Sequence, residues 1–174
     1  MTTIVFDTET TGLLLPKTAE LSKQPRIIEL AIAVVEDGKV VSEHEWLIQP
    51  ECPLPAIITK ITGLKDEDLI GKPLFRQILG EIEEIFGKAN AIIAHNAAFD
   101  VGMLTSELAR CARTGFPWPE HTICTVQEHM HLKGRRLKMT ELYELKLGKK
   151  LEQKHRAIDD VRALVEIVLK EGLA

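Results

Sequence analysis

The feature that most restricts the fold of this chain is the dipeptide Asp37-Gly38, which separates two strand-like runs. The runs are residues 26–36, RIIELAIAVVE, and residues 39–48, KVVSEHEWLI. Asp-Gly between two such runs is typical of a tight β-hairpin. Because the two strands of a hairpin are antiparallel, we expect a sheet that is at least partly antiparallel.

Helix-like and strand-like segments alternate after this hairpin. Residues 73–87 begin with Pro73 and end with Gly87, and their apolar residues recur at helical spacing. The other predicted elements are a short helix within 52–64, strands at 2–7, at 90–96 and from 121, and helices at 97–113, 139–148 and 157–172. A hairpin followed by such alternation predicts an α/β fold, in which a mixed sheet carries helices on its faces.

The bulk composition fits one globular domain in a reducing compartment. The chain has 174 residues, and 45% of them are hydrophobic, which is ordinary for a protein with a proper core. No apolar run approaches the roughly 20 residues that a membrane helix needs, and no signal sequence precedes the first strand. The three cysteines are too widely spaced for a disulfide framework. We therefore expect a cytoplasmic protein that does not act at a membrane.

Charge is distributed unevenly along the chain. Residues 133–156 contain nine basic and three acidic residues, a net charge of +6, so the rest of this −4 chain carries −10. A basic flank beside an acidic body can hold a polyanion while the carboxylates hold metal. A solvated surface with no ligand has the same composition, and charge alone favours that simpler interpretation.

The first candidate site residues follow the apolar run that starts at Ile4. This run leads into Asp7 and Glu9, which are two residues apart. Residues i and i+2 of a strand point to the same face, so we expect the two carboxylates side by side and Thr8 turned away. Carboxylates that close raise each other's pKa, and a divalent metal ion between them is the usual remedy.

Three further residues have the chemistry to complete such a site. Asp100 is expected one turn into a helix that follows a buried strand, and Asp160 in the first turn of the last helix, five residues after His155. Four carboxylates and a histidine at element ends can bind two hard cations, and oxygen ligands suit Mg²⁺ or Mn²⁺ better than zinc.

These residues lie in three motifs, FDTETTGL, HNAAFDVGML and HRAIDDVRAL. In this order and spacing, the chain resembles the DnaQ-like DEDDh 3′→5′ exonucleases, which include bacterial replicative proofreading subunits. The resemblance runs from residue 4 to about residue 170. Three motifs in order are far more specific than any one of them.

The resemblance implies a ribonuclease H-like fold with a five-stranded mixed sheet, forming a single exonuclease domain over residues 1–174. It also implies catalysis by two Mg²⁺ ions about 4 Å apart, with Mn²⁺ able to substitute. Asp7 would bridge both ions, Glu9 and Asp160 would complete one site, and Asp100 would act on the second mainly through water. His155 would take the proton from the attacking water, and nucleoside 5′-monophosphates would leave from a 3′ end.

The family pattern also implies residues that hold the terminal nucleotide of a single-stranded DNA substrate. These expected substrate-binding residues are Thr10, Gly12, Leu13, Ile61, Thr62, Leu64, Asn96, Phe99 and Arg156. Thr62 departs from the pattern, because the proofreading subunits have histidine there, and this departure puts one nucleotide contact in doubt.

Several alternatives stand beside this interpretation. The spacing of His121, Cys124, His129 and His131 fits no recognised zinc pattern. His95 is expected to form hydrogen bonds near the sheet end rather than to catalyse, and Asp159 to be an ordinary surface residue.

The functional class also has alternatives. An RNA-trimming enzyme of the same family is one, and an accessory subunit that binds nucleic acid or a DNA polymerase without cleaving is another. Replication and repair partners are both compatible with the motifs. Ending at Ala174 suggests a stand-alone enzyme, a phage version or a domain of a longer protein.

Overall fold

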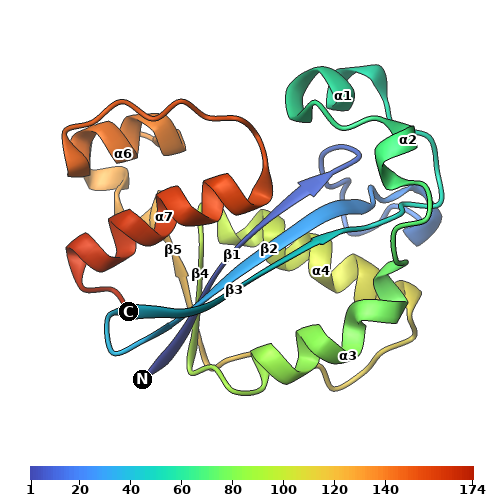
Figure 1. Cartoon of the computed structure of the whole chain (residues 1–174), viewed down its shortest axis with the longest axis horizontal. Helices are drawn as coiled ribbons and strands as arrows, with labels where there is room; N and C mark the ends of the chain where they lie inside the picture. Colours follow the sequence, from blue (N-terminus) through green and yellow to red (C-terminus); the bar gives the residue numbers. More distant parts are fainter.

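Five strands form one mixed sheet in the order β3-β2-β1-β4-β5, in a computed structural model that describes residues 1–174 (Figure 1). The strands are β1 (Thr2–Thr10), β2 (Ile27–Glu36), β3 (Lys39–Leu47), β4 (Ala91–Ala94) and β5 (His121–Cys124). β1, β2 and β3 pair antiparallel, whereas β4 pairs parallel with both β1 and β5. The predicted α/β fold with a five-stranded mixed sheet is confirmed.

The hairpin between β2 and β3 turns at the predicted dipeptide. Asp37 has φ 48° and Gly38 has φ 73°. Two successive positive φ angles are the signature of the type I′ turn, whose twist matches that of the flanking strands. The dipeptide therefore sets where the chain reverses, as the sequence predicted.

β1 is longer than predicted, and this matters for the site. It continues past Asp7 to Thr10, because β2 stays paired with it: Asp7 lies opposite Ala31 and Glu9 opposite Glu29. The register shifts only between Glu9 and Thr10. The two carboxylates are thus part of the ladder rather than part of a loop beyond it, which fixes their backbone.

Helices cover both faces of the sheet, with α3 and α4 on one face and α6 and α7 on the other (Figure 1). The helices are α1 (Ala56–Thr62), α2 (Asp66–Leu69), α3 (Phe75–Phe86), α4 (Ala97–Arg110), α5 (Thr125–Glu128), α6 (Met139–Leu147) and α7 (Ala157–Glu171), with 3₁₀ turns at Leu21–Lys23 and Met130–Leu132. The predicted helices are confirmed, although α4 ends three residues early. None of the helices combines the length and the apolar content needed to cross a membrane.

The two faces have separate hydrophobic cores, which follow the alternation of β1. Ile4 and Phe6 pack with α3 and α4, whereas Val5 packs with α6 and α7. On α7 the apolar residues at helical spacing are all buried, namely Ile158, Val161, Leu164, Val165 and Val168. Since side chains alternate along a strand, Asp7 and Glu9 point toward α7 and Thr8 points toward α4.

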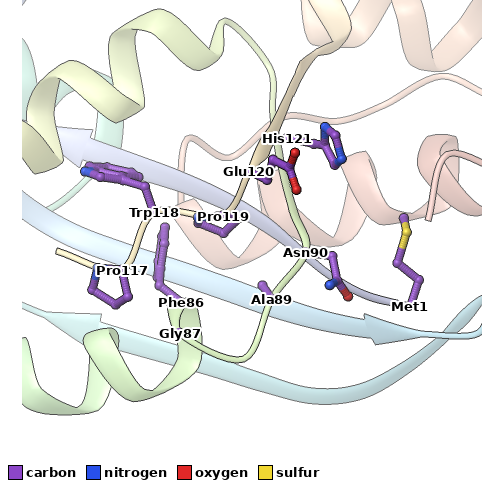
Figure 2. Close-up of a pocket in the computed structure, with 10 residues that line it drawn as sticks. All are labelled: Met1, Phe86, Gly87, Ala89, Asn90, Pro117, Trp118, Pro119, Glu120 and His121. Carbon is purple, nitrogen blue, oxygen red and sulfur yellow. The ribbon is translucent and has the colours of Figure 1, made fainter.

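A hollow of about 650 Å³ lies near the start of β1 and β4, at the opposite end of these strands from Asp7 (Figure 2). Its wall includes Phe86 and Trp118, which pack edge-to-face with ring centroids 5.8 Å apart. Trp118 is half-buried and packs against the core on this face of the sheet. The hollow contains none of the motif residues.

Candidate active site

All five motif residues line one pocket of about 200 Å³, near the second half of β1 and the starts of α4 and α7. The complete lining is Asp7, Thr8, Glu9, His95, Phe99, Asp100, Met139, Gln153, His155 and Asp160. Three segments that are about 90 and 60 residues apart in the sequence thus supply one acidic centre.

Asp100 reaches this centre from the face of the sheet opposite to Asp7 and Glu9. It is 2% exposed, and its Oδ1 accepts hydrogen bonds from the Thr8 backbone N–H (3.1 Å) and the Thr8 hydroxyl (2.7 Å). Thr8 does point away from its acidic neighbours, as predicted. Its side chain then anchors the third carboxylate at the same strand, so β1 positions acidic groups through both of its faces.

Glu9, His155 and Asp160 form the tightest group in the pocket. One potential ligand atom from each lies within 4.8 Å of the other two. Asp160 is held in the first turn of α7, and Nε2 of Gln153 lies 3.1 Å from each of its carboxylate oxygens. His155 precedes the helix in the left-handed backbone conformation, with φ 52°. This group could share a single cation.

The acidic cluster is electrostatically unfavourable as it stands. Burial, followed by the charges of Asp100 and Asp160, raises the pKa of Asp7 well above its ordinary value. Burial and then Asp160 raise the pKa of Glu9 to about 8. Burial raises the pKa of Asp100 to about 7, although the hydrogen bonds from Thr8 act in the opposite direction. Burial also raises the pKa of Asp160.

These residues have the donor chemistry that a hard divalent cation requires. Carboxylate oxygens are the ligands preferred by such ions, and a cation would offset the burial and the repulsion that disfavour the charged carboxylates. Asp7, Glu9, Asp100 and Asp160 can supply those oxygens. Perturbed carboxylates that converge in a pocket are also a general mark of a functional site.

His95 lines the pocket but is occupied by structural contacts. Its Nδ1 lies 3.0 Å from the Thr125 hydroxyl, and its Nε2 lies 3.1 Å from the Leu137 carbonyl. Burial lowers its pKa to about 4, so the ring is neutral at pH 7. It links β4 to α5 and to the start of α6, as expected for a residue that forms hydrogen bonds at the sheet end.

The residues expected to hold a nucleotide divide into accessible and buried groups. Leu13 is 81% exposed and Ile61 is 43% exposed, whereas Thr62 and Leu64 are each 5% exposed. The Thr62 hydroxyl donates to the Ile58 carbonyl and accepts from the Leu64 N–H, so its capacity is used within this corner of the chain. The side chains of Thr62 and Leu64 thus stabilise the end of α1 and the residues after it, and they leave little surface for a nucleotide to contact.

The remaining expected contacts lie close to the pocket. The Thr10 hydroxyl donates to the Gly12 carbonyl (2.7 Å), which closes the turn after β1. Phe99 lines the pocket directly. Asn96 caps α4 with φ 78°, and its Oδ1 accepts a hydrogen bond from Arg136.

Arg156, also expected to contact substrate, is turned toward protein carboxylates instead. Its guanidinium forms two hydrogen bonds to Glu29, at 2.9 and 3.0 Å, and a third to Glu45 at 3.2 Å. Its Nε and Nη2 donors are therefore committed inside the protein.

Two residues of this region were missed from the sequence. Glu29 did carry a signal, because it is a lone charged residue inside the buried run IIELAIAVV. Such a residue requires a partner, and its partner lies 127 positions away. Gln153 had no signal, because a glutamine in an irregular loop has no distinguishing pattern.

Comparison with known sequences matches this chain to a family. The model of the RNase T exonuclease family covers residues 4–168. The PolC-type DNA polymerase III of Clostridium perfringens is 31% identical over 165 residues, which are 95% of this chain and 11% of that protein. DNA polymerase III subunit epsilon of Treponema pallidum is 31% identical over 163 residues, 93% of this chain and 72% of that protein. The chain therefore spans only about a tenth of its PolC-type relatives.

Solved structures have the same fold. One is exonuclease X in complex with 5′ overhanging duplex DNA, with a TM-score of 0.68 and 24% identity over 98% of this chain and 93% of that one. Another is the nuclease domain of 3′hExo, a DEDDh family member bound to rAMP, with a TM-score of 0.79 and 14% identity over 99% and 92%. These likenesses show the ribonuclease H-like fold of DEDDh exonuclease domains. From residue 4 to residue 168, this chain is a member of the RNase T exonuclease family and a hydrolytic exonuclease.

Proposed function

We propose that this exonuclease removes nucleoside 5′-monophosphates from the 3′ ends of single-stranded DNA with the help of two Mg²⁺ ions. The observation that carries the proposal is the convergence of four carboxylates on one pocket beside His155. Burial raises the pKa values of all four carboxylates, and repulsion from the others adds to this for Asp7 and Glu9. An arrangement that is unfavourable without a cation, but well suited to one, supports metal-assisted hydrolysis.

In this proposal the carboxylates and the histidine have separate tasks. Asp7, Glu9, Asp100 and Asp160 hold the ions, which when bound neutralise the scissile phosphate and stabilise the departing 3′ oxygen. The Thr8 hydrogen bonds orient Asp100 toward the cluster. His155 accepts the proton of the attacking water, a task that suits a group titrating near neutrality. Mn²⁺, which accepts the same oxygen ligands, should replace Mg²⁺.

The terminal nucleotide would lie against the accessible side chains around the pocket. Leu13 and Ile61 supply exposed apolar surface on which a base can stack, and Phe99 supplies a wall. Gly12 leaves the backbone after β1 open to the sugar. Asn96, at the start of α4, has an amide that can contact the nucleotide.

DNA is the proposed substrate because the relatives at 31% identity are DNA polymerase III proteins. A proofreading or repair role follows, with a DNA polymerase as partner and the bacterial cytoplasm as location. A single catalytic domain, residues 1–174, suffices for the chemistry. RNA trimming is the second candidate, because one structure of the same fold is bound to rAMP and another recognises a histone mRNA stem-loop. A purely binding role is disfavoured, because it gives four convergent carboxylates no task.

The decisive experiment is digestion of 5′-labelled single-stranded DNA, duplex DNA, duplex with a mismatched 3′ end, and RNA of the same sequence. We expect single-stranded DNA to be shortened fastest from its 3′ end, and EDTA to abolish the reaction. Full activity in EDTA would refute the metal-dependent mechanism. Preferential loss of the 5′ label would refute the direction, and faster digestion of RNA would favour the second candidate.

A further inference from the structure

An ion pair next to His155 has no task in the proposed chemistry. Arg156 donates from Nε to one carboxylate oxygen of Glu29 at 2.9 Å and from Nη2 to the other at 3.0 Å. Glu29 is fully buried in the middle of the sheet. A bidentate arginine–carboxylate pair is geometrically specific, because both partners are planar and only one orientation satisfies both hydrogen bonds.

The pair joins the start of α7 to β2, the strand that pairs antiparallel with β1. Burial raises the pKa of Glu29, whereas Arg156 and the backbone N–H of Ala157 act in the opposite direction. The carboxylate thus faces the N-terminal end of α7, where the helix dipole also favours negative charge. Two consecutive residues, Arg156 and Ala157, are held to β2 in this way.

His155 is the residue immediately before Arg156. Its φ of 52° belongs to the left-handed region, which is unfavourable for a residue with a Cβ. Such a conformation persists only where the surroundings impose it. Residues 149–156 contain no helix or strand. Of the two neighbours of His155, Lys154 forms only an exposed ion pair with Asp159 at 3.8 Å, whereas Arg156 is bound to a buried carboxylate.

The Arg156–Glu29 pair also lies next to a carboxylate that neighbours His155 in the pocket. Glu29 lies directly opposite Glu9 in the β1–β2 ladder. Glu9 is in turn one of the two carboxylates whose oxygens lie within 4.8 Å of the His155 ring. The bond between Arg156 and Glu29 thus ties the segment that carries His155 to β2, which is paired with β1, the strand that carries Glu9.

We propose that Arg156 and Glu29 are positioning residues, which hold His155 in its left-handed conformation and aim its ring at the reacting water. The proposal rests on the role of His155 as general base given above. It assigns Arg156 no contact with nucleic acid or metal, and it predicts that the pair acts on the rate of the chemical step rather than on substrate binding.

The test is a double-mutant cycle between Arg156→Ala and His155→Ala in the full chain. Single-turnover cleavage of 5′-labelled single-stranded DNA with Mg²⁺ gives the rate of the chemical step, and its dependence on enzyme concentration gives substrate affinity. We expect Arg156→Ala to lower the rate by about 10²-fold, as a misplaced catalytic group does, with affinity unchanged. In the His155→Ala background the same change should alter the rate by less than about 2-fold.

Arg162→Ala is the matched control. Arg162 lies on the same helix and forms an equivalent pair with Glu43 on β3, with contacts from 2.7 to 3.2 Å, but it is not adjacent to His155. It should leave the rate unchanged. Arg156→Lys keeps the charge without the planar fork and should give an intermediate rate. Should Arg156→Ala not fold, Arg156→Lys and Glu29→Gln enter the same cycle in its place.

The possible failures are distinct. An equal loss of rate in both backgrounds would overturn the positioning role, because Arg156 would then act independently of His155. Weakened substrate affinity with an unchanged rate would also overturn it and would make Arg156 a nucleic-acid contact. If His155→Ala alone retains the wild-type rate, the general base of the proposed function is rejected as well.

Discussion

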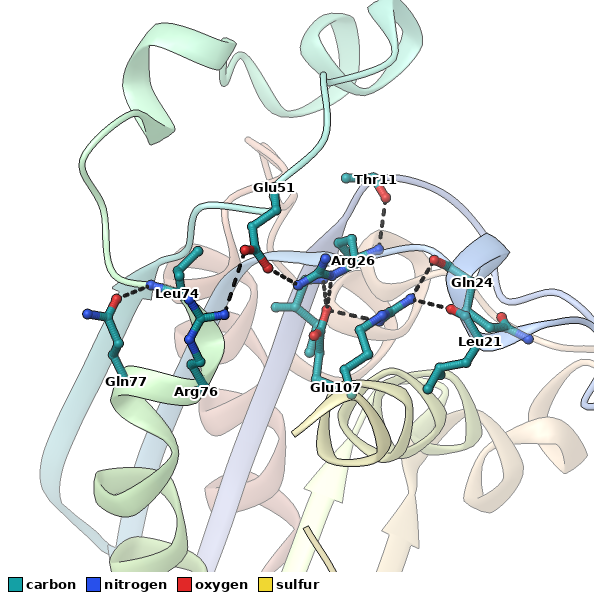
Figure 3. A network of polar contacts seen from close by, with 11 residues as sticks. Thr11, Leu21, Gln24, Arg26, Glu51, Leu74, Arg76, Gln77 and Glu107 are labelled. Atoms are coloured by element: carbon teal, nitrogen blue, oxygen red, sulfur yellow. Dashed lines mark hydrogen bonds and ion pairs between the residues drawn. The ribbon is translucent and has the colours of Figure 1, made fainter. Parts of the chain in front are cut away.

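The negative charge of buried carboxylates is offset in different ways at two places in this protein. Glu107, 1% exposed on α4, receives Arg26 Nε at 3.0 Å and the Ile27 N–H at 3.1 Å on its Oε1, and Arg110 lies 3.2 Å away (Figure 3). Arg26 also bonds to Glu51. The four carboxylates of the pocket have no comparable arginine, since Arg156 is bound to Glu29 instead.

The difference separates structure from chemistry. A buried carboxylate that serves folding has its positive partner built into the chain, as Glu107 does. The carboxylates of the pocket are held by β1, α4 and α7 with their pKa values raised, so their positive partner has to come from outside. Burial alone does not distinguish the two clusters, whereas the location of the countercharge does.

The largest expected effect is the loss of activity in Asp7→Asn. Asp7 is proposed to bind both ions, and an amide is a poorer metal ligand than a carboxylate. We expect almost no turnover at any pH and weakened Mn²⁺ binding, measured by single-turnover cleavage and by metal titration. Glu107→Gln is the counterpart and should cleave at the wild-type rate while folded. Equal losses in the two variants would abolish the distinction between the clusters.

His155→Ala should lower the rate by roughly 10²–10⁴-fold, the range for a general base. Metal and DNA binding should stay near normal, because His155 is proposed to act on the water. The acidic limb of the pH–rate profile should weaken or vanish, since that limb reports deprotonation of the histidine. A wild-type rate in this variant would leave the third motif as no more than a helix start.

Glu107→Gln should cost about 3 kcal/mol of stability, the low end of the range for breaking a buried pair. The low end is expected because the Arg26 and Arg110 side chains remain 20% and 14% exposed. Urea unfolding measures this loss, and the m-value shows whether the transition is comparable with wild type. An unchanged midpoint would mean that the arginines of this cluster are not needed to offset its charge.

The stability of the metal-free protein should fall as pH rises from about 4.5 to about 8. The folded pKa of Glu9 is raised from 4.5 to about 8, so its contribution is fully present below the unfolded value and is lost as pH rises through the folded one. Mg²⁺ should restore stability at the alkaline end, because it binds the ionised, folded form.

Asp7→Asn offers a sharper version of this measurement. It removes one of the repelling charges, so the Tm of the metal-free protein at about pH 8 should rise by roughly 4–8 °C, the shift that about 2 kcal/mol gives in a domain of this size. The gain should shrink toward about pH 4, because burial and the neighbouring carboxylates raise the pKa of Asp7 and wild-type Asp7 takes up its proton as the pH falls. A gain of equal size at both pH values would point to packing rather than charge.

The smallest expected effect concerns the basic segment 133–156. Arg135 is paired with Glu141 by two hydrogen bonds, whereas Arg136 reaches Asn96 at the start of α4. Arg136→Glu should weaken substrate binding and reduce its salt dependence by a slope of about one. Arg135→Glu is the control and should do less. Unchanged affinity in both variants would make this segment an ordinary solvated surface.

Local patterns were enough to predict the elements and the chemistry of the site. The Asp37-Gly38 turn, the alternation of β2 and the helical spacing of α7 depend on neighbours in the chain, so the sequence predicts them directly. The three motifs likewise identified five of the ten residues that line the acidic pocket, because each motif carries its residues within about ten positions.

Only the tertiary structure decided how those residues are held. β1 extends through Glu9 because β2 pairs with it, and Asp100 is fixed by Thr8 from the opposite face of the sheet. Thr62 is unavailable to a nucleotide because its hydroxyl is used inside α1. Strand register and helix docking join partners that are tens of residues apart, and no spacing in the sequence encodes such a meeting. The pairing of Arg156 with Glu29 arises in the same way, because it exists only where α7 crosses β2.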